Sequence, residues 1–192
     1  VTINTDRTIT TTADAVSFAT DVTLNKTGGT GLLTINTTSG SALGNDITFS
    51  GKLDGTTAGA EPVTLNAGTA GNIVFTGAVG ATGVANRLGA IRITNANDVT
   101  ESAGITAASL VQTTGQGTTL LSGAVNTNAA AGVNLTGNIQ TVDNPITTTG
   151  GGTVTFANAG LLTLIGDISS DGAVAQTGAG LVTINTDRTI TT

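Results

Sequence analysis

Short runs in which apolar and polar residues alternate recur along the whole chain, and they constrain its fold more than any other feature. The run ITFSGKL at 47–53 is typical, and IVFTGAV at 73–79 and LTLIGDI at 162–168 repeat its pattern. Such alternation is typical of a β-strand with one buried face. No segment has a convincing helical period, so the sequence predicts an all-β fold.

The alternating runs come in pairs, and the pairs recur at the spacing of solenoid coils. The second run of a pair reads apolar-x-apolar-x-small-x-apolar, and its small residue, often Gly, is expected to allow a corner. The first runs carry apolar residues two apart at Val1/Ile3, Leu33/Ile35, Val63/Leu65, Ile91/Ile93, Val133/Leu135, Val154/Phe156 and Val182/Ile184. Successive second runs lie about 20 to 35 residues apart, the length of a solenoid coil. We therefore predict a parallel β-helix (β-solenoid) of seven coils per unit, or eight if Val1–Ile9 and Val16–Leu24 belong to separate coils.

A β-sandwich is the alternative all-β fold. It would favour short hairpins, but no Asn-Gly or Asp-Gly pair forms a two-residue turn between alternating runs. A β-helix needs no hairpins, because each strand pairs in parallel with the equivalent strand of the next coil, about 4.8 Å away. The sequence therefore favours the β-helix.

The first eleven residues of the chain return as its last eleven: 182–192 is identical to 1–11, at an offset of 181. This identity indicates a tandem array, so we expect 1–181 to be one β-solenoid unit and 182–192 the start of the next identical unit. We also expect the second copy to hold, in the next unit, the place that the first copy holds here, with the phase of the solenoid restored after seven or eight coils. The inward residues of the two copies are expected to form the junction between units: Val1, Ile3, Ile9, Val182, Ile184 and Ile190.

The repeats resemble those of large bacterial β-solenoid exoproteins. The segments that carry the likeness are NDITFSG (45–51), GNIVFTGAVGA (71–81), AIRITNANDVT (90–100) and GTVTFANAGLLTLIGDI (152–168). In repeat style and composition, the whole chain is similar to filamentous-haemagglutinin-like adhesins and autotransporter passenger domains. The resemblance implies a right-handed parallel β-helix that projects from a cell for attachment or surface structure. It implies no catalytic residue, since no shared one maps onto this chain.

Composition limits the compartment and the partners of the chain. It contains no Cys, Met, Trp, Tyr or His, and only 9% of its residues are charged. Chains rich in Thr, Asn and Gly and free of sulfur are common among exported bacterial surface proteins, so we expect an extracellular or cell-surface location. Six Lys and Arg and a net charge of −6 make nucleic acid an unexpected partner. Membrane insertion is not expected either, because no apolar run approaches about 20 residues.

One carboxylate breaks the apolar pattern. Glu101 falls where the aligned coils have Phe18, Phe49, Phe75, Leu121 and Leu164. A buried, unpaired carboxylate is costly, so we expect that the register slips at Val99–Ser102 and exposes Glu101, or that it has a partner such as Arg92. The functional alternative is a catalytic or ligand-binding carboxylate, as in β-helix enzymes that cut acidic polysaccharides.

Several other acids lie near expected turns, and they raise the question of calcium. They are Asp46, Asp54, Asp143, Asp167 and Asp171. Calcium needs several oxygens that converge on one point, and only Asp167 and Asp171 lie close together in sequence. Zinc needs Cys or His in practice, and both are absent. We expect no cofactor, with calcium as the one weak alternative.

These observations favour a structural protein over an enzyme. We expect a repeat unit of a long extracellular fibre or stalk, whose partners are identical copies stacked end to end, within one chain or as subunits. The alternative is an adhesin module that binds a glycan or another surface through its loops. Exposed aromatic side chains would favour that alternative, but most of the four Phe residues fall at inward positions. A polysaccharide-processing enzyme would need clustered acids on neighbouring coils, which the pattern does not provide.

Overall fold

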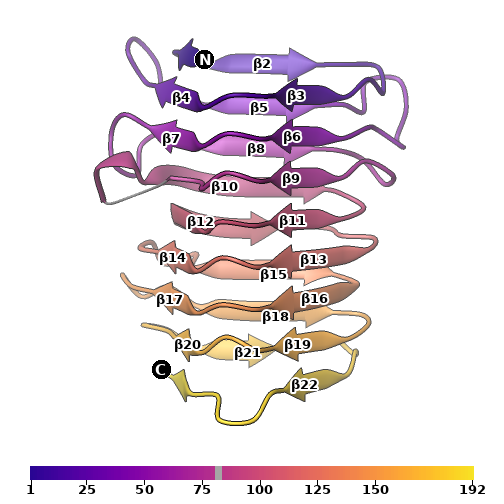
Figure 1. Cartoon of the computed structure of the whole chain (residues 1–192), viewed down its shortest axis with the longest axis vertical. Coiled ribbons are helices and arrows are strands. Elements are labelled where there is room, and N and C mark those ends of the chain that lie inside the picture. The colour runs from indigo at the N-terminus through magenta and orange to yellow at the C-terminus, as the bar shows by residue number, and fades with distance from the viewer. Residues whose placement is uncertain (81–83) are drawn as a thin grey trace.

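The chain is a right-handed parallel β-helix of about eight coils, described here by a computed structural model that covers residues 1–80 and 84–192. The chain descends from the N-terminus and runs right to left along the front strands and left to right along the back strands (Figure 1), which is a right-handed path. The pairs of named strands are all parallel, as is expected when coils stack directly on one another. The predicted fold class is confirmed.

Each coil has three faces, each formed by a ladder of stacked strands. Face 1 contains β1 (Thr2–Asn4), β4 (Val22–Asn25), β7 (Leu53–Gly55), the first part of β12 (Ile105–Gln112), β14 (Val125–Thr127), β17 (Ile146–Thr148), β20 (Ile168–Ser169) and β23 (Ile190–Thr191). Val79 continues face 1 between β7 and β12, through single bridges to Leu53 and Ile105.

Face 2 follows face 1 along the chain. It contains β2 (Arg7–Thr10), β5 (Leu33–Asn36), β8 (Val63–Asn66), β10 (Leu88–Asn95), the second part of β12, β15 (Val133–Gly137), β18 (Val154–Asn158) and β21 (Val174–Gln176). A short 3-10 turn, η1 (Val84–Asn86), precedes β10.

Face 3 completes each coil. It contains β3 (Val16–Phe18), β6 (Ile47–Phe49), β9 (Ile73–Phe75), β11 (Val99–Glu101), β13 (Thr118–Leu121), β16 (Ile139–Val142), β19 (Leu162–Leu164) and β22 (Val182–Ile184). Each predicted second run spans two faces, because it bends between face 3 and face 1.

The small residue of the second run marks that bend, as predicted. A Cβ at Gly77 would lie 2.4 Å from the backbone of Gly51 in the preceding coil, and a Cβ at Gly166 would lie 2.1 Å from the carbonyl oxygen of Asn144. At these two positions the preceding coil therefore approaches too closely for a side chain. Glycine is selected here by contact with the neighbouring coil.

The inward residues form continuous apolar columns along the axis. On face 1 the column contains Val22, Leu53, Val79, Ile105, Val125, Ile146 and Ile168, each at most 2% exposed. On face 3 the rings of Phe18, Phe49 and Phe75 stack, with centroids 5.2 and 5.5 Å apart. Full burial of such a side chain contributes roughly 1.5–3 kcal/mol, so the columns provide much of the stability of the rod.

The coils are wider in the N-terminal half than in the C-terminal half. Paired residues of successive face 3 strands are 31, 26 and 26 residues apart from β3 to β11. From β11 to β22 they are only 20 to 22 apart. The extra residues form loops at 26–32, 37–46 and 56–62, which project in the upper half of Figure 1.

Candidate functional site: the two open ends

The end coils expose what the interior coils bury. An interior strand pairs with a neighbour on each side, whereas β1, β2 and β3 at one end and β21, β22 and β23 at the other each pair on one side only. At the C-terminal end, Val182, Ile184 and Ile190 are 43%, 51% and 44% exposed. Their partners one coil earlier are Leu162, Leu164 and Ile168, which are 1–4% exposed. The apolar columns therefore continue to the end and stop without a cover.

The N-terminal end is open in the same way. Val1 is 62% exposed, while Ile3, Ile9 and Phe18 are half-buried and pack against the core. Together with Arg7 they line a depression of about 400 Å³ in this end of the rod. Thus the six predicted junction residues lie at the two ends, three at each. Their role in joining units remains a prediction.

The two copies of the repeated segment lie on different faces, so the expectation that the phase of the solenoid is restored after seven or eight coils is wrong. In the first copy β1 lies on face 1 beside β4, and β2 lies on face 2 beside β5. In the second copy β22 lies on face 3 beside β19, and β23 lies on face 1 beside β20. The two copies differ because the chain between them does not make a whole number of coils: from β1 to β22 it makes seven complete coils and two further faces.

The first copy holds the coil that follows it through Asp6. Its Oδ1 accepts hydrogen bonds from the hydroxyl and the N–H of Thr30, at 2.8 and 2.9 Å, and from the N–H of Leu32 at 3.1 Å. The Thr30 hydroxyl and then the Leu32 N–H hold the pKa of this carboxyl below its ordinary value. Asp6 thus fixes the loop at 26–32 against the first coil.

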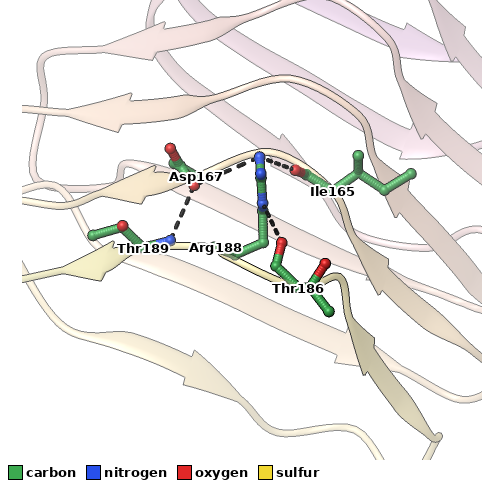
Figure 2. Close-up of polar contacts among 5 residues, drawn as sticks. All are labelled: Ile165, Asp167, Thr186, Arg188 and Thr189. Atoms are coloured by element: carbon green, nitrogen blue, oxygen red, sulfur yellow. Dashed lines mark hydrogen bonds and ion pairs between the residues drawn. The ribbon is translucent and has the colours of Figure 1, made fainter.

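The second copy holds the coil that precedes it through Arg188 (Figure 2). Its Nη1 donates to the carbonyl oxygen of Ile165 at 2.8 Å and lies 3.8 Å from Oδ1 of Asp167. Its Nε donates to the carbonyl oxygen of Thr186 at 3.3 Å, and Asp167 accepts the N–H of Thr189 at 3.0 Å. The two copies therefore use different residues of the same sequence to contact coils on opposite sides.

The turn between the two strands also differs between the copies. The left-handed conformation falls on Thr5 in the first copy, with φ 57°, and on Asp187 in the second, with φ 60°. Asp187 is equivalent to Asp6, so the turn is displaced by one residue. The same eleven residues accept both forms of turn.

Glu101 keeps its place in the face 3 column: the expected register slip is wrong, and the expected partner exists but is not Arg92. It pairs in register with Phe75 and Leu121 and is fully buried, so the register does not slip. Its partner is not Arg92, which is exposed. Oε1 accepts from the N–H groups of Ala103, at 2.6 Å, and Gly104, and Oε2 accepts from the N–H of Gly123 at 2.9 Å. The carboxylate satisfies backbone donors at the corner between faces 3 and 1.

Four of the five turn acids have visible partners that connect neighbouring coils. Asp46 accepts from the N–H of Asn72, Asp143 from the hydroxyl of Ser122, Asp167 from the N–H of Thr189 and Asp171 from the N–H of Gly151. Asp54 also has an interaction. Within residues 1–80 and 84–192, no group of three or more His, Cys, Asp or Glu is placed to hold a metal.

Comparison of the chain with protein-family models, with curated proteins and with solved structures finds no match. The part of the chain that the structure describes contains no helix long and apolar enough to cross a membrane. Function is therefore inferred from the geometry of the rod and of its ends.

Proposed function

We propose that the chain is a structural repeat unit of a long rod, in which identical units stack end to end as one continuous β-helix. The observation that carries the proposal is the pair of open ends that share an eleven-residue sequence. An uncovered sheet edge and an uncovered apolar column are liabilities in an isolated protein. A following unit removes both, because it pairs the free strand edges and buries the apolar side chains. Stacked repeats of this kind are usually spacers rather than catalysts.

A chain of joined units tests this proposal. Chains with one, two and four units, each unit being 1–181, would be compared by small-angle X-ray scattering. At about 4.8 Å per coil, each unit should add about 37 Å of length with no change in cross-section. Units that scatter as beads on a flexible string, whose length does not grow by a constant amount per unit, would contradict the proposal.

We place this rod outside the cell, among bacterial surface fibres. The absence of Cys and Met and the abundance of Thr, Asn and Gly support this location, as does the resemblance of the repeats to those of secreted β-solenoid proteins. Antibody raised against the unit should label intact cells of the source organism. Labelling that appears only after the cells are opened would contradict the location.

The alternative function, adhesion through loops, is supported by the wide N-terminal coils. The loops at 26–32, 37–46 and 56–62 are absent from the narrow coils after β11, so they are dispensable for stacking. They carry no aromatic side chain, because the four Phe residues lie in strands at positions that face the core. A glycan array screened with the unit, and with a variant whose loop 56–62 is shortened, would test adhesion. Binding lost on shortening would support it, and a blank array would oppose it.

A further inference from the structure

We propose that successive units join with a rotation of one face, a third of a turn, so that three units are needed to restore the phase of the rod. This inference rests on the proposed end-to-end stacking and adds the geometry of the joint. One sequence lies on two different pairs of faces, faces 1 and 2 in the first copy and faces 3 and 1 in the second.

The free edges of the two copies are complementary. The first copy pairs only with the coil that follows it, through β4 and β5, and the second only with the coil that precedes it, through β19 and β20. In a joined chain the two copies become one segment. That segment can pair on both sides at once, because the two sets of partners occupy opposite edges.

The registers of the two sets also agree. Leu164 pairs with Ile184, and Ile3, the same residue in the first copy, pairs with Leu24. A joined ladder would therefore run Leu164, Ile184 and Leu24 of the next unit, all inward. A slip of one residue would reverse inward and outward positions, and no such slip is needed.

The second strand of the segment gives the same result. Ile168 pairs with Ile190, and the equivalent Ile9 pairs with Ile35. Ile168 and Ile35 are both buried core residues. The joined ladder again keeps an unbroken apolar column.

The polar contacts of the two copies are compatible as well. Asp6 binds the following coil, and Arg188 binds the preceding coil. In the joined segment these are neighbouring residues, so one Asp-Arg pair supplies a contact to each side once the segment takes a single turn in place of the two forms. The two sets of contacts compete for no side chain.

This joint exchanges the faces from unit to unit. Face 3 of one unit continues as face 1 of the next, face 1 continues as face 2, and face 2, through β21, continues as face 3. The unit contains seven coils and two faces, so three units contain twenty-three coils. The true axial repeat is then about 110 Å at about 4.8 Å per coil. The loops of the wide coils would project in three directions around the rod.

A cross-link across the joint tests the rotation. In a two-unit chain, the rotated joint stacks β21 of the first unit directly on β3 of the second, and places Ala175 beside Ser17 of the second unit. A joint that restores the phase would instead place β2 of the second unit on β21, with Ala175 beside Thr189. Adjacent in-register strands bring their Cα atoms to about 4.8 Å, within the range for a disulfide. The chain contains no native Cys to interfere.

Two double variants separate the two joints. Ala175→Cys with Ser17→Cys of the second unit should form a disulfide on oxidation, seen as a linked peptide by mass spectrometry. Ala175→Cys with Thr189→Cys should not. The positive control is Thr155→Cys with Ala175→Cys, because these residues are paired on adjacent strands within one unit.

The outcomes distinguish failure of the rotation from failure of stacking. A Thr189 cross-link without the Ser17 cross-link would overturn the rotation and leave end-to-end stacking intact. Failure of both, with the control formed and the two units unfolding independently, would overturn stacking itself. Failure of both in a chain that unfolds as one unit would overturn the rotation alone.

Discussion

The same eleven residues form the first strands and the last strands of this molecule, and they have different neighbours in the two places. In the first copy they run along faces 1 and 2, and in the second along faces 3 and 1. Both copies keep the same side chains on the inner side, as the pairs Ile3 with Leu24 and Ile184 with Leu164 show. A strand of this chain therefore specifies which side chains face inward, and it does not specify the face on which it lies.

The interior of the rod supports that conclusion. The tetrapeptide VTLN occurs as β4 on face 1 and again as β8 on face 2. Both copies have the same alternation of buried and half-buried residues. The face on which a strand lies is therefore determined by the corners and loops before it, and not by the sequence of the strand itself.

The largest expected effect concerns the uncovered end. In the single 192-residue unit Ile184 is half exposed, so Ile184→Ala should lower the free energy of unfolding by about 1 kcal/mol or less. In a two-unit chain the same residue lies inside the column, and the loss should be about 2–5 kcal/mol. Urea unfolding measures both. Leu164→Ala is the matched control, since it is already buried and should cost about 2–5 kcal/mol in either chain. Equal, small effects of Ile184→Ala in both chains would show that the second copy never becomes interior.

The next effect concerns an interior strand that breaks the apolar pattern. Glu101→Leu restores an apolar column but removes the acceptor of three backbone N–H groups. Each orphaned buried donor costs about 1–3 kcal/mol, so the variant should be less stable by about 2 kcal/mol or more in spite of its better hydrophobic match. Glu101→Gln retains one acceptor oxygen and should lose less. A Glu101→Leu protein as stable as the parent would mean that the corner needs no acceptor.

A smaller effect tests directly whether strands are interchangeable between faces. Changing β5 from LTIN to VTLN, by Leu33→Val with Ile35→Leu, gives a face 2 strand the sequence that β4 has on face 1. Because inward volume changes little, the cost should be below about 1.5 kcal/mol. Thermal and urea unfolding measure it. A loss comparable to that of Leu164→Ala would show that faces demand specific strands.

The smallest expected effect concerns the polar contacts of the two copies at low pH. The pKa of Asp6 is lowered in the folded protein, so its contribution to stability is complete above the unfolded-state pKa of about 3.9 and is lost as pH falls through the folded-state pKa. Asp6→Asn should therefore flatten the dependence of the urea midpoint on pH between about pH 5 and 2. Asp187→Asn is the matched control, because in the single unit Asp187 has no following coil to bind. If the two variants flatten the curve equally, the contact with Thr30 contributes nothing.

The sequence predicts the strands and the inward columns well, because alternation reports directly on a half-buried strand. It also predicts the corner after Phe49 and Phe75, since a residue without a side chain is the one that fits there. It does not reveal that the second run divides between two faces, because the alternation continues through the corner at Gly51 and Gly77. Because the corner is hidden in this way, the sequence alone cannot decide between seven and eight coils.

Two features of the site, the partners of Glu101 and the faces of the two copies, cannot be predicted from the pattern of side chains in the sequence. The partners of Glu101 are backbone N–H groups, which every residue carries and no sequence pattern identifies. The faces of the two copies depend on the summed path of all the coils between them, including wide coils whose loops have no regular length. The expectation of a restored phase assumed that 181 residues form a whole number of coils, whereas they form seven coils and two faces.

Electron cryo-microscopy of a four-unit chain would observe the joint between units directly. We expect one uninterrupted β-helix, in which the 182–192 segment pairs on both edges and the loop at 56–62 recurs about every 37 Å, turned by a third of a turn each time. Separate solenoids, with an irregular segment between one unit and the next, would contradict end-to-end stacking.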